Sequence, residues 1–147
     1  MPFEESKRMR LKTIKMNKKE EKESIHVCVN EVYISRKGHE RVTLEIIVDG
    51  EVLTKTAGDG LLISTPTGST AYSLSAGGPI LENGVNGILI VPISPNSLSF
   101  RPICLPSNSE IKVKVKIYLF SCMAVQEAKP TQVLTVSLLR ISNLMIN

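Results

Sequence analysis

The chain has 147 residues and a formal net charge of +4, with 42% hydrophobic and 22% charged residues. This balance is typical of one globular domain, and the longest central apolar run, residues 88–91, is far too short to cross a membrane. The first residues include acidic side chains and no apolar run, so we expect no secretory signal. Three widely spaced cysteines fit neither a disulfide framework nor a zinc site. We therefore expect a cytoplasmic protein with no membrane partner.

Residues 1–24 form a charged N-terminal segment that holds eight Lys or Arg and five Glu. Within it, residues 10–14 can form a first strand, and residues 15–24 are polar enough for a loop or hairpin tip. A basic segment can bind nucleic acid. Here acidic residues are interspersed and no aromatic residue lies between the lysines, which favours a solvated charged segment. We expect no nucleic-acid partner.

Hydrophobic periodicity predicts strands in the first half of the chain. Residues 25–35 are largely apolar around a central Asn-Glu pair. Every second residue from 42 to 48 is apolar, as in a half-buried strand. The Asp49-Gly50 pair follows at once and predicts a tight hairpin turn, because both residues tolerate a positive φ.

The second half of the chain gives further strand signals and one helix signal. Residues 111–119 alternate apolar side chains with lysine or tyrosine, and residues 133–139 have the character of a final strand. A helix is predicted over residues 69–76, where a Gly-Gly-Pro stop follows. Prolines divide the stretch after residue 91 into short extended pieces. The fold class expected is mainly β, an antiparallel two-sheet β-sandwich with one short helix.

The stretch from residue 58 to residue 79 carries the strongest functional signal. A short buried strand at residues 61–63 leads into a turn and a helix start, where unpaired N–H groups can bind a phosphate. Gly68 allows a ligand to approach closely, and Tyr72 can stack on a base. The turn also supplies hydroxyl groups, from Thr65, Thr67, Ser69 and Thr70. The alternative is a plain N-capped helix, and neither a P-loop nor a Rossmann fingerprint is present.

These residues resemble the signature of the NAD kinase family. The matching pieces are Asp59-Gly60, then Thr65-Pro66-Thr67-Gly68-Ser69-Thr70-Ala71-Tyr72, then Ser75-Ala76-Gly77-Gly78-Pro79. Three more pieces resemble family landmarks in the same order: Arg8-Met9-Arg10-Leu11, Asn30-Glu31-Val32 and Ser97-Leu98-Ser99-Phe100-Arg101-Pro102. The likeness assigns residues 8–147 to the family's C-terminal, NAD-binding β-sandwich domain.

The resemblance implies an activity and a set of site residues. Family members phosphorylate the 2′-hydroxyl of the adenosine ribose of NAD to give NADP, using ATP and Mg²⁺, and the β-sandwich binds the dinucleotide and builds a homo-oligomer. By this likeness Asn30 holds the adenosine end, Glu31 binds a ribose hydroxyl, and Asp59 faces the nicotinamide end. The adenosine pocket is implied to be lined by Thr67, Thr70, Ala71, Tyr72 and Ser75. Taken singly, each has an ordinary structural alternative as a turn, cap or surface residue.

The sequence also departs from the family. Its Gly-Gly-Asp-Gly motif, which supplies the general base in an N-terminal α/β domain, does not occur in these 147 residues. We therefore expect no catalytic residue here and no activity from this chain alone. Asn96 stands where many members have His, and residues 117–124 depart from the family's usual strand and turn. A non-catalytic NAD(P)-binding or oligomerisation module is the alternative function, and a lipid kinase relative is a weaker third.

Overall fold

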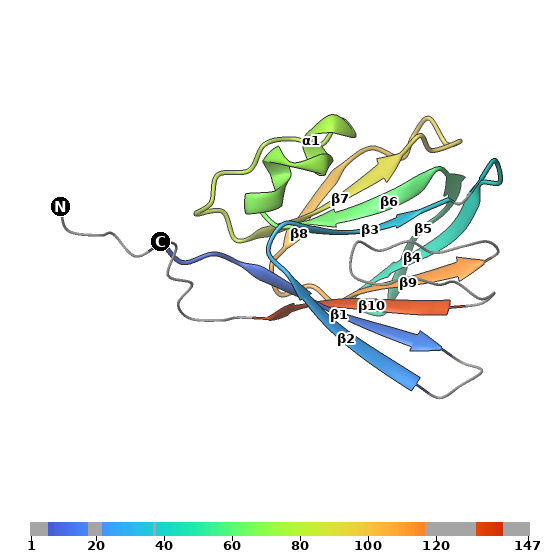
Figure 1. Ribbon diagram of the computed structural model, residues 1–147. Helices are drawn as coiled ribbons and strands as arrows, with labels where there is room; N and C mark the ends of the chain where they lie inside the picture. The colour runs from blue at the N-terminus through green and yellow to red at the C-terminus, as the bar shows by residue number, and fades with distance from the viewer. Residues whose placement is uncertain (1–5, 18–21, 37, 117–131, 140–147) are drawn as a thin grey trace.

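The computed structural model describes residues 6–17, 22–36, 38–116 and 132–139, and these residues form two antiparallel sheets packed face to face (Figure 1). The larger sheet has the strand order β2-β1-β10-β9-β4-β5. Its strands are β1 (Arg10–Asn17), β2 (Lys22–Cys28), β4 (Val42–Val48), β5 (Glu51–Gly58), β9 (Ile111–Lys116) and β10 (Gln132–Leu139). This arrangement places the strand nearest the C-terminus between β1 and β9.

The smaller sheet has the order β3-β6-β7-β8 and carries the helical segment on its outer face (Figure 1). Its strands are β3 (Glu31–Ser35), β6 (Gly60–Ser64), β7 (Gly87–Ile93) and β8 (Ile103–Pro106). All five residues of β6 are buried, since one face meets the main core and the other meets a second cluster of Leu62, Leu89 and Val91. This double burial explains why β6 lacks a polar alternation in sequence.

The main core lies between the two sheets and is built from aliphatic side chains. β4 and β9 contribute their alternate residues, and β3, β6 and β7 face them from the other sheet. The most deeply buried members include Leu44, Ile46, Ile63, Ile90 and Ile111, each at most 1% exposed. Because burying one such side chain stabilises a fold by about 1.5–3 kcal/mol, this core fixes the positions of β3 and β6 firmly. The candidate site lies at the start of β3 and the end of β6.

Most predicted strands are confirmed, as is the two-sheet β-sandwich. The hairpin predicted at Asp49-Gly50 joins β4 to β5, and both residues have positive φ, 50° and 91°. The loop predicted over residues 15–24 is shorter than expected, because β1 extends to Asn17 and β2 begins at Lys22. Residues 117–119, and the departure from the family over 117–124, lie outside the described residues. In the part of the chain that the structure describes, no helix is long and apolar enough to span a membrane.

Candidate nucleotide-binding site

The turn that leaves β6 is bound to the turn between β2 and β3 by Thr65. Its backbone N–H donates to the Asn30 carbonyl at 2.9 Å, and its hydroxyl approaches the carbonyls of Val29 at 2.6 Å and Asn30 at 3.1 Å. The same Thr65 oxygen accepts from the Gly68 N–H at 3.0 Å. Thr65 is fully buried. It therefore joins the two turns internally, although its hydroxyl was expected to be available to a ligand.

Gly68 brings these two turns into direct backbone contact. A Cβ atom added at Gly68 would lie 2.1 Å from the Asn30 oxygen and 2.7 Å from the Asn30 Cα. No side chain fits at that distance, so glycine is required by space. The contact places Asn30 and Glu31 beside the segment that begins at Thr67. It brings together two groups of predicted site residues that lie far apart in sequence.

The helix predicted over residues 69–76 is wrong in its continuity. The structure has a 3₁₀ turn, Thr67–Thr70, and then a single α turn, Tyr72–Ser75. Ala71 separates them with φ −96° and ψ −129°, which no helix allows. Ser69 explains part of the break, because its buried hydroxyl donates to the Pro66 carbonyl and accepts from the Leu81 N–H. Such short turns carry little helix dipole, so any attraction for anions has to come mainly from side chains.

Tyr72 is presented at the surface by the α turn. Its side chain is 41% exposed, and its ring meets the ring of Tyr33 edge to face, with centroids 5.7 Å apart. Edge-to-face pairs of this kind stabilise by about 0.5–1.5 kcal/mol. Tyr33 thus holds the Tyr72 ring in place while leaving part of it accessible. Thr70 and Ser75 are also exposed, and Ala71 is half-buried between them.

Glu31 has an unusual environment at the start of β3. Its Oε2 atom is buried and has no hydrogen-bond partner among the described residues. Burial raises the pKa of this carboxyl above its usual range, because water no longer stabilises the charged form well. Neighbouring Asn30 is exposed, and its carbonyl is already used by the Thr65 turn. Glu31 therefore has a buried acceptor oxygen that no described residue uses.

Asp59 lies apart from the other predicted site residues. Gly60 pairs with Ser35 at one end of the β3–β6 ladder, whereas Glu31 pairs with Ser64 at the other end. At about 3.3 Å of rise per residue, the two ends are roughly 13 Å apart. The Asp59 carboxylate pairs with the Arg36 guanidinium at 2.8 Å, and both side chains are about one-third exposed. Sequence reasoning missed this ion pair.

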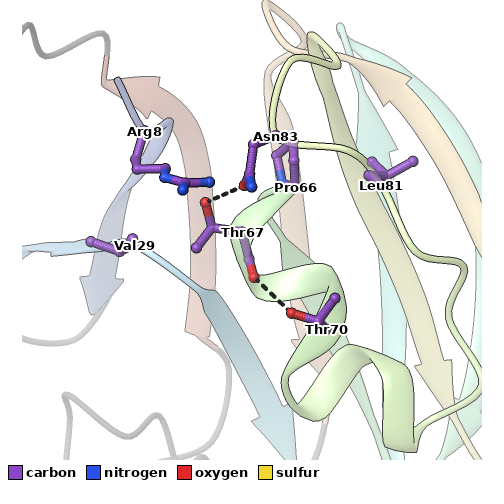
Figure 2. A pocket seen from close by; sticks show the side chains of 7 residues that line it. All are labelled: Arg8, Val29, Pro66, Thr67, Thr70, Leu81 and Asn83. Carbon is purple, nitrogen blue, oxygen red and sulfur yellow. Dashed lines mark hydrogen bonds between the residues drawn. The ribbon is translucent and has the colours of Figure 1, made fainter. Parts of the chain in front are cut away.

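A cleft opens beside the 3₁₀ turn (Figure 2). It has a volume of about 300 Å³ and lies between the residues before β1, the β2–β3 turn, the 3₁₀ turn and the loop before β7. Two of its lining residues, Thr67 and Thr70, were predicted to belong to the site. The others are Arg8, Val29, Pro66, Leu81 and Asn83. Arg8 stood within a matched family landmark, whereas no local signal pointed to Asn83.

Comparison with known proteins identifies the family. The model of the ATP-NAD kinase C-terminal domain matches residues 29–137. This chain belongs to that family. The NAD kinase of Flavobacterium psychrophilum is 46% identical over 111 residues, which are 75% of this chain and 38% of that protein. The mitochondrial NADH kinase POS5 of Saccharomyces cerevisiae is 48% identical over 102 residues, 68% of this chain and 25% of that protein.

A solved structure agrees with these relatives. The crystal structure of yeast NADH kinase complexed with NADH superposes with a TM-score of 0.86 at 36% identity, covering 92% of this chain and 41% of that one. The chain therefore spans less than half the length of each of these NAD and NADH kinases. The resemblance to the C-terminal domain of the NAD kinase family is confirmed.

One departure from the family has a structural account. Asn96 stands where many ATP-NAD kinases have His, and here it fastens the end of β5. Its N–H donates to the Ala57 carbonyl at 2.8 Å, and its Oδ1 accepts from the Ala57 N–H at 3.2 Å. The Thr56 hydroxyl adds a longer contact to the same oxygen, at 3.4 Å. Asn96 thus holds the strand that leads to Asp59.

The Mg²⁺ that the family resemblance implied finds no fitting ligand set in the described part of the chain. There, no group of three or more His, Cys, Asp or Glu side chains converges as a metal site. Mg²⁺ prefers carboxylates, waters and substrate phosphates in octahedral geometry. The unpaired Glu31 oxygen is a single acceptor and does not make such a site.

Proposed function

We propose that this chain is the NAD-binding half of an ATP-dependent NAD kinase, which phosphorylates the 2′-hydroxyl of the adenosine ribose of NAD to give NADP. The contact of Gly68 with the Asn30 backbone carries this proposal, since it sets Asn30 and Glu31 beside the 67–75 segment. The NAD and NADH kinases that the chain resembles support it. Because a solved structure that the chain resembles is a yeast NADH kinase complexed with NADH, we extend the proposal to the reduced dinucleotide.

The roles within the site follow from which groups keep a capacity to bind. Glu31 lies half-buried at the start of β3, and we assign its carboxylate to a ribose hydroxyl, from which it can accept a hydrogen bond. Tyr72 has an exposed ring that can cover the adenine, and Tyr33 holds that ring. Asn30 is exposed at the adenosine end. The rest of the adenosine pocket is proposed to consist of Thr67, Thr70, Ala71 and Ser75.

The chain's part in the reaction is positioning. Phosphoryl transfer depends mainly on alignment of the reacting groups and on stabilisation of charge. The residues named above would bind the adenosine end and orient its ribose. The general base and the sites for ATP and Mg²⁺ are assigned to a domain that carries the Gly-Gly-Asp-Gly motif, which these 147 residues lack.

Assembly into a homo-oligomer would complete the site. Asp59 lies roughly 13 Å from Glu31 along the β3–β6 ladder, so we assign it to the nicotinamide end of a neighbouring copy's site. The edge strand β2 also exposes Ile25 (57%) and Val27 (46%) on its outer face. An edge strand with exposed apolar side chains favours association.

Calorimetric titration of the chain with NAD and NADH tests the proposal. We expect saturable binding, and Tyr72→Ala should weaken it roughly ten- to a hundredfold, because base stacking contributes about 1–3 kcal/mol. The matched control is Leu74→Ala, which removes a similarly exposed side chain (44%) from the same α turn. Equal affinities of the two variants, or no binding by the wild-type chain, would refute the proposal.

A further inference from the structure

The cleft of Figure 2 combines one positive charge with neutral polar groups. The lining contributes the Arg8 guanidinium, the hydroxyls of Thr67 and Thr70 and the amide of Asn83. The remaining lining residues, Val29, Pro66 and Leu81, are apolar. No carboxylate is among the described residues that line the cleft. This composition suits an anionic ligand that also has an apolar face.

Arg8 is available for such a ligand. Figure 2 shows its guanidinium directed towards Thr67 and Asn83, across the mouth of the cleft. Within the described part of the chain, the ion pairs involve other cations, Arg36, Lys55, Lys112 and Lys114, and none involves Arg8. Guanidinium groups bind phosphate with two parallel hydrogen bonds and are only weakly hydrated, which makes an unpaired arginine a strong phosphate ligand.

Asn83 can add donors to the same ligand. The Thr67 hydroxyl donates to the Asn83 Oδ1 at 3.1 Å, so the acceptor side of the amide is occupied and its N–H₂ group is the part left for a ligand oxygen. The Thr70 hydroxyl makes a weaker contact, 3.4 Å, with the Thr67 carbonyl. These contacts orient the neutral polar side chains opposite Arg8. The positive charge of the cleft comes from the Arg8 guanidinium.

We propose that this cleft is a phosphate subsite and that Arg8 makes the site prefer phosphorylated nucleotides over adenosine. The inference rests on the proposed function in one respect, since Thr67 and Thr70 are shared with the adenosine pocket. A volume of about 300 Å³ is at the small end for ligand pockets, so the cleft accommodates part of a dinucleotide. The phosphate can be the pyrophosphate of NAD or the 2′-phosphate of NADP.

The experiment compares four probes on the full 147-residue chain and its variants. Adenosine, NAD, NADP and inorganic pyrophosphate are titrated by calorimetry into wild-type protein, Arg8→Gln, Arg8→Lys and Arg41→Gln. Arg41 is an exposed arginine outside the cleft and serves as the matched control. Arg8 is half-buried and precedes the first strand, so Arg8→Gln leaves the strands themselves unchanged, and circular dichroism and Tm verify that the variant folds.

We expect Arg8→Gln to bind at least one phosphorylated nucleotide about tenfold more weakly than wild-type protein, while its affinity for adenosine stays unchanged. The affinity of Arg8→Lys should lie between those of the wild type and Arg8→Gln, because lysine retains the charge and loses the planar fork. Weaker binding of both NAD and NADP identifies the pyrophosphate as the group bound by Arg8, whereas weaker binding of NADP alone identifies the 2′-phosphate. Added salt should reduce the wild-type affinity for the affected ligand more than that of Arg8→Gln.

Two results would overturn the subsite. One is equal affinities of Arg8→Gln and Arg41→Gln for every phosphorylated probe. The other is an equal loss for adenosine, which would make Arg8 a structural residue. The pyrophosphate titration separates this inference from the proposed function. If wild-type protein binds no dinucleotide, the proposed function fails, and the subsite still stands or falls on whether Arg8→Gln lowers pyrophosphate affinity.

Discussion

Replacing Gly68 by alanine tests the contact on which the candidate site depends. The added Cβ would lie 2.1 Å from the Asn30 oxygen and 2.4 Å from its carbonyl carbon, and both are backbone atoms that no side-chain rotation can move away. An ordinary contact begins near 3.4 Å. To restore an ordinary contact, the two turns therefore have to move apart by roughly 1 Å or more.

That separation has a calculable cost. Thr65 makes two contacts with the Asn30 carbonyl, at 2.9 Å and 3.1 Å, and neither remains a hydrogen bond after such a shift. Overpacking costs about 1–3 kcal/mol and a lost hydrogen bond about 1 kcal/mol. Because two hydrogen bonds are lost, we expect Gly68→Ala to lower the free energy of unfolding by about 3–5 kcal/mol. For a domain of this size the Tm falls by roughly 10–20 °C.

The assay pairs thermal melting with calorimetric titration of NAD well below the Tm of the variant, where the protein is folded. NAD affinity should fall at least about tenfold, because a shift of 1 Å misplaces Asn30 and Glu31 relative to Tyr72. Gly84→Ala is the control, since nothing lies within 4 Å of its added Cβ and its φ is not left-handed. A Gly68→Ala variant that melts and binds NAD like the wild type would refute the reasoning.

Three further predictions concern acid–base behaviour and activity. Glu31→Gln should raise the Tm at pH 7 and lower the affinity for NAD. The difference in Tm between variant and wild type should fade as the pH falls towards about 4, because burial raises the pKa of the folded-state carboxyl and the unfolded-state carboxyl also becomes protonated there. Glu45→Gln should have the opposite effect, because the ion pairs with Lys114 (2.8 Å) and Lys55 (3.3 Å) lower the pKa of Glu45 in the folded protein. The variant should have a lower Tm than the wild type at pH 7. This difference should disappear as acid protonates the wild-type carboxyl. With NAD, ATP and Mg²⁺, the chain alone should form no NADP, because general base catalysis contributes about 10²–10⁴-fold; robust turnover by protein from a host without its own NAD kinase would contradict this.

The sequence predicted those features of the fold that depend on local patterns. Alternation identified β4 and β9 because alternate residues of each strand lie in the core between the sheets, and the Asp49-Gly50 turn followed from its tolerance of positive φ. The unbroken helix over residues 69–76 was wrong because tertiary contacts decide that segment. Ser69 is held by Leu81 from the following loop, and Gly68 is pressed against Asn30. Neither neighbour is visible in a window of local sequence.

The site shows the same division between local and distant causes. The family signature predicted Asn30, Tyr72 and the Thr-rich turn as site residues, because those residues lie within short recognisable pieces. The cleft was not predictable, since Arg8 and Asn83 meet only after β1 and the loop before β7 are placed. The pairing of Arg36 with Asp59 depends likewise on the register of β3 with β6.

The hydroxyl-rich turn suggested many ligand contacts, yet several of its polar groups are used within the fold. The hydroxyls of Thr65 and Ser69 are buried and bound to backbone atoms. By contrast, Glu31 has an acceptor oxygen without a partner, and Tyr72 keeps an accessible ring. Unused binding capacity, and not polarity alone, therefore separates residues that can bind a ligand from residues that support the turn. By this argument Ser69→Ala acts first on stability, whereas Glu31 and Tyr72 variants act first on affinity.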